Sequence, residues 1–125
     1  APEPAGLRAR VHIIDDEPRV ARAIARMLSP HDVVVFTDPE DALRAIEQGD
    51  VPDVILCDLM MQPLTGPEVY AALPEALRGV FWVVTGGGET AATRRFQREM
   101  GDRVLLKPPE QRVLREIVAG VLAGD

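Results

Sequence analysis

The alternation of short apolar runs with amphipathic segments is the feature that most constrains how this 125-residue chain can fold. Five runs of mostly aliphatic residues, too short for helices, occupy residues 11–14, 33–36, 53–59, 80–85 and 103–107. After each run comes a segment with apolar residues at helical spacing, near residues 18–28, 38–49, 66–73, 89–100 and 113–122. This repeated strand–helix order predicts a parallel sheet with helices packed on it.

The strand segments are apolar throughout, as expected for strands that helices cover on both faces. We therefore predict an α/β fold of the flavodoxin-like type. It is a (βα)5 doubly wound, five-stranded parallel sheet with strand order 2-1-3-4-5. Residues 9–123 are predicted to form this single domain. The Pro-, Ala- and Gly-rich residues 1–8 are predicted to be a linker or the boundary of a cloned segment.

Composition narrows the range of functions. A net charge of −6 argues against a nucleic-acid-binding surface, which normally carries a basic excess. No apolar run is long enough to span a bilayer, so no membrane partner is expected. The one cysteine, Cys57, can form no internal disulfide, which fits a reducing compartment, and we expect a cytoplasmic location.

Polar residues stand where the predicted strands end. Asp15 and Asp16 follow the first strand, Asp58 lies near the end of the third, Thr85 closes the fourth and Lys107 closes the fifth. In the predicted strand order the first and third strands are neighbours, so the three aspartates converge where such sheets bind ligands. Carboxylates packed together repel unless a cation joins them, and Mg²⁺ is the most plausible cation. A carboxylate nucleophile, a metal, a hydroxyl and a lysine are the parts that phosphoryl transfer to aspartate requires.

Four motifs appear in order at these strand ends: "DD" at 15–16, "CDLMMQPLTG" at 57–66, "VVT" at 83–85 and "LLKP" at 105–108. With them, the chain resembles the receiver domain of two-component response regulators, the CheY-like family, from about Arg10 to Leu122. The match covers nearly the whole chain. Each motif alone is a weak signal, but the four in this order are highly specific.

The resemblance implies a Mg²⁺ site and a phosphoacceptor. Asp16 and Asp58 would bind Mg²⁺ directly, Asp15 through water, and the Met60 backbone carbonyl would complete the protein ligands. Asp58 would also accept a phosphoryl group as an acyl phosphate.

The resemblance also implies partners. The phosphoryl donor would be a histidine kinase or a phosphotransfer protein, and Thr85 and Lys107 would contact the phosphoryl oxygens. The domain would promote only its own phosphorylation and dephosphorylation, and so would not be an enzyme acting on other substrates. Its output domain or protein is unknown, and a homodimer through the fourth helix, fifth strand and fifth helix is possible.

Two departures from the family pattern leave alternatives open. Val104 stands where the family commonly has a switching aromatic ring, and Gln62 stands where proline is frequent. These departures allow a degenerate receiver that acts as a phosphorylation-independent interaction module. A small Mg²⁺-dependent aspartyl phosphohydrolase is a further alternative. Such enzymes usually need a second acid two residues after the nucleophile, where this chain has Met60.

Two further features have plain structural interpretations. His12 lies within an apolar strand segment, so we interpret it as a core histidine with satisfied hydrogen bonds. The arginines of residues 94–98 are interpreted as a solvated helix face, although this helix belongs to the family's usual partner surface.

Overall fold

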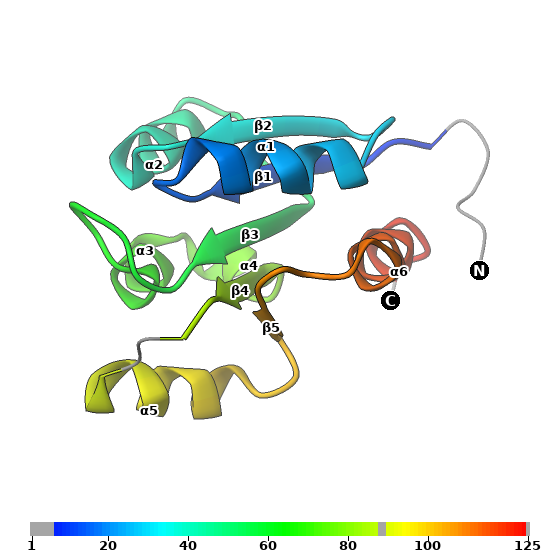
Figure 1. Ribbon diagram of the computed structural model, residues 1–125. Coiled ribbons are helices and arrows are strands. Elements are labelled where there is room, and N and C mark those ends of the chain that lie inside the picture. Colours follow the sequence, from blue (N-terminus) through cyan, green and yellow to red (C-terminus); the bar gives the residue numbers. More distant parts are fainter. Residues whose placement is uncertain (1–6, 88–89, 125) are drawn as a thin grey trace.

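The structure, a computed structural model, describes residues 7–87 and 90–124. Within them lies a five-stranded parallel sheet in the order β2-β1-β3-β4-β5 (Figure 1). The predicted fold class and strand order are therefore confirmed. Most of the predicted 1–8 segment lies outside the described residues, so its interpretation stays a prediction.

The five strands are β1 (Arg10–Ile14), β2 (Asp32–Phe36), β3 (Val54–Asp58), β4 (Phe81–Thr85) and β5 (Val104–Leu106). The helices are α1 (Pro18–Met27), α2 (Pro39–Glu47), α3 (Gly66–Ala72), α4 (Glu75–Arg78), α5 (Ala91–Met100) and α6 (Gln111–Leu122).

Local sequence signals set several helix starts. Pro18 and Pro39 occupy the first positions of α1 and α2, where a missing N–H group leaves no hydrogen bond unmade. The Asp38 carboxylate caps α2 by accepting a hydrogen bond of 2.9 Å from the backbone N–H of Glu40. Thr65 and Glu68 form a capping box at the start of α3. These caps fix where each helix leaves the carboxyl edge of the sheet.

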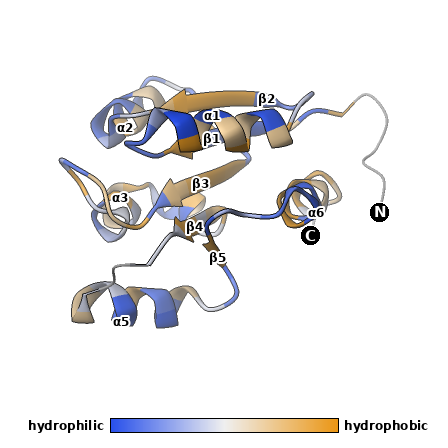
Figure 2. Ribbon diagram, viewed as in Figure 1, coloured by the Kyte–Doolittle hydropathy of each residue, from blue (hydrophilic) through white to orange (hydrophobic). Residues whose placement is uncertain are grey.

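Two apolar cores lie on opposite faces of the sheet (Figure 2). One packs the sheet against α2, α3 and α5, and includes an edge-to-face aromatic cluster of Tyr70, Phe81 and Phe96, whose ring centroids lie 5.2–6.4 Å apart. The other packs the sheet against α1 and α6. Every residue of β3 is buried, so the strand that ends in Asp58 is held from both faces.

The structure differs from the sequence-based expectation in two places. The single-turn helix α4 follows Pro74, where only the end of the third helix was predicted. The apolar strand β5 ends in Leu106, which is 71 % exposed, whereas Val104 and Leu105 of the same strand pack on the two cores. Leu106 is exposed because it is the last residue of an edge strand of only three residues. Among the described residues, no helix is both long and apolar enough to cross a membrane.

Candidate functional site

The carboxyl ends of four strands bring the predicted site residues to one edge of the sheet (Figure 1). Asp15 follows β1 directly, Asp58 is the last residue of β3, Thr85 is the last residue of β4, and Lys107 follows β5 directly. Parallel pairing aligns these ends, which is why residues up to 92 positions apart in the sequence can meet.

Lys107 stands at the centre of the charged groups. Its Nζ lies 3.0 Å from an Asp15 carboxylate oxygen, 3.3 Å from one of Asp58 and 3.8 Å from one of Glu17. Asp15 and Asp58 are almost fully buried, at 2 % and 6 % exposed, whereas Asp16 is exposed. The single lysine of the chain therefore neutralises part of a buried acidic pair.

The three aspartates also form a possible metal site. One carboxylate oxygen from each of Asp15, Asp16 and Asp58 lies within 4.8 Å of the other two. Ligand oxygens around an octahedral Mg²⁺ lie roughly 3–4 Å apart, given metal–oxygen distances of about 2.0–2.1 Å. Three hard oxygen donors at this separation fit Mg²⁺, with a small inward movement or a bridging water.

Burial and charge both act on Asp58. Burial and the neighbouring Asp15 charge raise the pKa of Asp58 to about 6, against the opposing effect of Lys107. Burial alone would lower the pKa of Lys107, but its hydrogen bond to Asp15 and the charge of Asp58 outweigh burial, so that pKa is raised. At neutral pH the buried pair Asp15 and Asp58 therefore carries one more negative charge than Lys107 can balance, before Asp16 is counted, and a divalent cation would relieve this imbalance.

Backbone N–H groups orient the acidic side chains. The Glu17 N–H donates to Asp15 at 2.9 Å, and the Gln62 N–H donates to Asp16 at 3.3 Å. The backbone N–H of Met60 donates to the Asp58 carboxylate. Met60 thus contacts the site through its amide, and the predicted role of its carbonyl as a metal ligand stays a prediction.

Thr85 is buried at the same edge, but its hydroxyl is engaged within its own loop. Its Oγ1 accepts a hydrogen bond of 3.2 Å from the backbone N–H of Gly87. The Lys107 N–H donates to the Thr85 carbonyl at 2.8 Å, so the backbones of the two residues are tied together. The Thr85 oxygen is the acceptor in this bond, so its own O–H stays available to donate to a phosphoryl oxygen.

Gly66 closes the loop that follows Asp58. A Cβ placed on Gly66 would lie 2.8 Å from the Asp58 carbonyl oxygen and 3.1 Å from the Leu59 Cα. The Gly66 N–H also donates to the Leu59 carbonyl at 2.9 Å. Only glycine fits this close approach of the start of α3 to the end of β3.

Two neighbours of the site are not reactive groups. Cys57 is fully buried, and its burial, together with the charges of Asp58 and Asp15, raises its pKa well above the ordinary value, so the thiol stays protonated. Val104 is partly buried and packs on the core beside α5. It offers no ring that could move between buried and exposed positions.

Sequence reasoning missed two contacts of Lys107. Glu17 approaches Lys107, although it had only the appearance of an acidic helix start. Gly86 lies along the lysine stem, since a Cβ placed there would be 3.6 Å from the Lys107 Cδ. Neither contact has a local signal, because each joins residues more than 20 positions apart.

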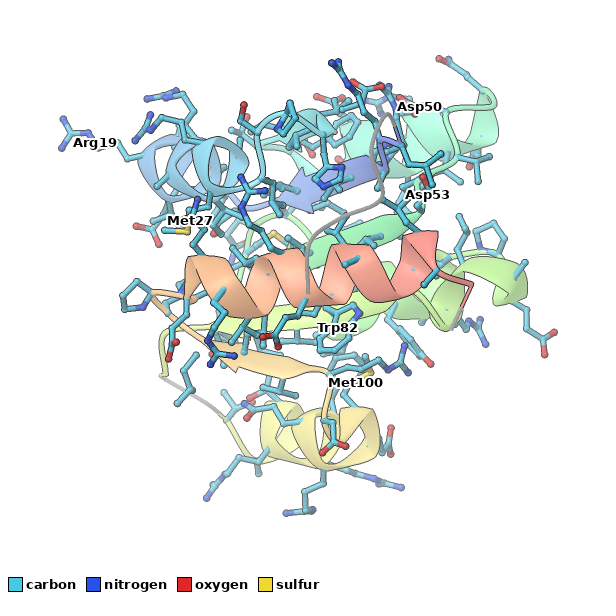
Figure 3. The ribbon with its side chains drawn as sticks, turned by 90° about the vertical axis from the view of Figure 1, so that its right-hand side faces the viewer. Arg19, Met27, Asp50, Asp53, Trp82 and Met100 are labelled. Atoms are coloured by element: carbon cyan, nitrogen blue, oxygen red, sulfur yellow. The ribbon has the colours of Figure 1, made fainter. Side chains whose placement is uncertain are left out.

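A groove elsewhere on the molecule does not coincide with these charged residues. It has a volume of about 610 Å³ and lies between α6 and strands β4 and β5, beside Trp82 (Figure 3). Its lining contains none of Asp15, Asp58 or Lys107. This groove is therefore a feature separate from the candidate site.

Comparison with known proteins agrees with this geometry. The response regulator receiver domain family matches residues 11–119. A search of curated proteins found no match. Among solved structures, a receiver domain of a Francisella response regulator has 20 % identity and a TM-score of 0.75, covering 94 % of this chain and 100 % of that one.

Two other solved structures are equally similar in fold. A CheY-like receiver domain protein from Methanospirillum hungatei has 23 % identity and a TM-score of 0.76, covering 94 % of this chain and 96 % of that one. The signal receiver domain of a modulated diguanylate cyclase from Desulfovibrio desulfuricans has 24 % identity and a TM-score of 0.78, with the same coverage. At these identities the likeness supports the fold alone, whereas the family match extends over most of the sequence. The chain therefore belongs to the response regulator receiver domain family of two-component signalling.

Proposed function

We propose that this chain is a phosphoacceptor receiver domain that takes a phosphoryl group onto Asp58 in a Mg²⁺-dependent reaction. The observation that carries the proposal is the setting of Asp58, a buried carboxylate between Lys107 and the Asp15–Asp16 pair. The phosphoryl donor would be a histidine kinase or a phosphotransfer protein, because the family is a two-component signalling family. Members of this family are generally signalling modules rather than enzymes.

The chemistry follows from the charges at the site. An Asp58 carboxylate oxygen attacks phosphorus as the phosphorus–nitrogen bond of the donor phosphohistidine breaks, and the bonding electron pair leaves on the imidazole nitrogen. Lys107 is placed to balance charge on the phosphoryl oxygens. Bound Mg²⁺ would be held by Asp15, Asp16 and Asp58, and would supply the positive charge that lets an anionic phosphoryl group approach a carboxylate.

The rival phosphohydrolase function has less support. The residue two positions after Asp58 is Met60, whose side chain is 40 % exposed and cannot transfer a proton. The degenerate-receiver alternative rests on Val104 and Gln62, and neither residue removes a charged group from the site. The predicted homodimer face, formed by α5, β5 and α6, stays a prediction.

Phosphorylation tests the proposal directly. Incubation with acetyl phosphate and Mg²⁺ is expected to add one phosphoryl mass to the intact protein, and chelation of Mg²⁺ is expected to abolish the addition. Asp58→Asn is expected to remain unmodified, because an amide is a poor nucleophile. If the acyl phosphate hydrolyses too quickly to be detected, binding of beryllofluoride, monitored by NMR, is the alternative measurement. The absence of both adduct and complex, or an adduct that persists in Asp58→Asn, would contradict the proposal.

Lys107→Arg is expected to impair the response to phosphorylation while leaving the fold intact. The Lys107 stem passes Gly86, and its Nζ approaches two buried carboxylates. A broad guanidinium cannot take this position together with a metal and a phosphoryl group. NMR shift changes at the Val104 and Leu106 amides on beryllofluoride binding are expected to be markedly smaller than in the wild type. Equal changes in both proteins would show that the pocket accepts either cation.

A further inference from the structure

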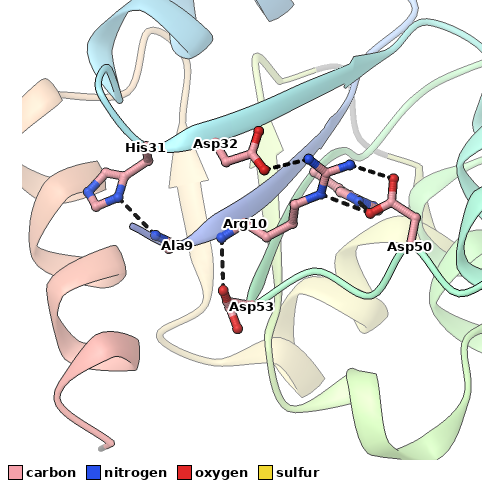
Figure 4. A network of polar contacts seen from close by, with 7 residues as sticks. Ala9, Arg10, His31, Asp32, Asp50 and Asp53 are labelled. Atoms are coloured by element: carbon pink, nitrogen blue, oxygen red, sulfur yellow. Dashed lines mark hydrogen bonds and ion pairs between the residues drawn. The ribbon is translucent and has the colours of Figure 1, made fainter. Parts of the chain in front are cut away.

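A polar cluster at the amino end of the sheet joins β1 to β2 and to the loop between α2 and β3 (Figure 4). The Arg10 guanidinium lies 2.6 Å from an Asp32 oxygen and makes two hydrogen bonds to Asp50, of 2.9 and 2.7 Å. The Arg10 N–H donates to the Asp53 carboxylate at 2.8 Å, and the Asp53 N–H donates to the Arg10 carbonyl at 2.7 Å. The loop is therefore attached to β1 at two residues, Asp50 and Asp53.

His12 completes this cluster from inside the core. Its side chain is fully buried, its Nε2 lies 2.9 Å from an Asp50 oxygen, and its ring meets Phe36 edge-to-face at 5.0 Å. An ionised Asp50 can only accept hydrogen bonds, so Nε2 carries the proton of the neutral ring. Nδ1 is buried with no hydrogen-bond partner in the described part of the chain. The expectation that His12 is a fully satisfied core histidine is thus met by only one of its two nitrogens.

A second proton on His12 would have no acceptor. It would reside on Nδ1, where a buried donor without a partner costs free energy. The charged groups that face His12 are Arg10 of β1, Asp32 of β2 and Asp50 of the loop. Burial lowers the pKa of His12 below its ordinary value of 6.5, and this effect outweighs the hydrogen bond and charge of Asp50.

We propose that His12, Asp50 and Arg10 form an acid-sensitive latch, which holds the loop of residues 48–53 on β1 while His12 is neutral and releases it when His12 takes up a proton. Release follows because a charged ring is stable only where Nδ1–H can reach water. Leaving the buried position breaks the bond from Nε2 to Asp50. Because the released state binds one more proton than the closed state, acid favours release, and the closed state dominates as the pH rises.

The latch is separate from the candidate phosphorylation site. Asp50 and Asp53 lie at the end of the molecule opposite Arg19, which follows β1 at the carboxyl edge (Figure 3). The latch requires neither phosphorylation nor a bound metal. It adds a pH response to a domain whose proposed signal is a phosphoryl group.

Amide hydrogen exchange measured by NMR tests the latch in the whole chain. The Asp53 amide reports the attachment, because it donates to the Arg10 carbonyl. The Val83 amide, which donates to the Arg103 carbonyl at 2.9 Å on the far strand pair, is the control for global opening. Between pH 7 and 5, the Asp53 protection factor is expected to fall by up to about tenfold per pH unit, while that of Val83 holds.

The matched variant is His12→Phe, which keeps an aromatic ring against Phe36 but cannot titrate. In this variant the Asp53 protection factor is expected to be independent of pH over the same range. The proposal would be overturned if the protection factors of Asp53 and Val83 fell in parallel in the wild type. It would also be overturned if the Asp53 protection factor fell equally in the variant.

A second measurement needs no variant. NMR titration of the His12 imidazole signals, assigned through the backbone, is expected to give a pKa below 6.5. A pKa at or above 6.5 would show that the closed cluster accepts the second proton, and the proposal would fail.

Discussion

Asp58→Asn is expected to raise the free energy of unfolding of the metal-free protein at pH 8 by about 2–3 kcal/mol. The pKa of Asp58 is about 6 in the fold, against an ordinary value of 3.8. Folding therefore favours the protonated form, and the stability associated with this group is fully present below pH 3.8 and lost as the pH rises through 6. Near pH 4 the variant and the wild type are expected to unfold at nearly the same urea concentration. Urea denaturation in chelator, followed by fluorescence of the single Trp82, measures the difference.

Asp50→Asn is the matched control with the opposite sign. Arg10 and His12 hydrogen-bond the Asp50 carboxylate, and the Arg10 bond is the main cause that lowers its pKa to about 2. This group contributes stability above pH 3.8 that is lost as the pH falls toward 2. Its replacement is therefore expected to destabilise the protein at pH 8 by about 2 kcal/mol. If Asp58→Asn also destabilises the metal-free protein at pH 8, or if its effect does not vary with pH, the charge imbalance assigned to the site is wrong.

Gly66→Ala is expected to lower the free energy of unfolding by about 1–3 kcal/mol, because the added Cβ meets backbone atoms rather than a flexible side chain. The nearest of these atoms is the carbonyl oxygen of Asp58, at 2.8 Å. Relief of the contact requires the end of β3 or the start of α3 to move, which displaces the Asp58 carboxylate from Asp15 and Asp16. The variant is therefore also expected to bind Mg²⁺ more weakly, as measured by isothermal titration calorimetry.

Gly79→Ala is the control for this steric effect, because it replaces a glycine with alanine at a position where the added Cβ causes no clash. Gly79 has a φ of −72°, and a Cβ placed on it meets nothing within 4 Å. Its replacement is expected to change stability by no more than about 0.5 kcal/mol and to leave Mg²⁺ binding unchanged. Equal effects of the two substitutions would show that Gly66 has no special steric role.

Without a bound cation, the charged groups of the candidate site are expected to lower the free energy of unfolding. Asp15 and Asp58 are buried together with one lysine between them, so the metal-free protein holds an excess negative charge at its core edge. A ligand that binds only the folded state stabilises it by RT ln(1 + L/Kd), where L is the ligand concentration, so the gain rises with the logarithm of that concentration. Binding of Mg²⁺ is therefore expected to be coupled closely to folding stability.

The fold and the charged residues of the site could be predicted from the sequence because both rest on patterns along the chain. Apolar runs and helical spacing gave the order of elements, and the strand ends then placed Asp15, Asp58 and Lys107 at one edge. The same patterns could not predict α4, since a single turn of four residues leaves no periodic signal. They could not predict the exposure of Leu106 either, because an apolar residue in an edge strand gives the same sequence pattern as one in a central strand.

The latch lay beyond sequence reasoning for a different reason. Arg10 and Asp50 are 40 positions apart, and each alone is an ordinary surface charge. Only the pairing of β1 with β2 and β3 brings them together over His12. Long-range polar contacts of this kind depend on how neighbouring strands are aligned. A single sequence does not show which side chains that alignment will bring together.

The shortness of β5 has a consequence for self-association. An exposed strand edge can template pairing with another chain, and an apolar edge residue such as Leu106 would ordinarily increase that hazard. A strand of three residues in a parallel sheet turns only alternate peptide groups outward, so it offers a neighbouring chain very few hydrogen bonds. The protein can thus expose an apolar side chain at this edge without presenting a strand long enough to nucleate fibrous aggregation.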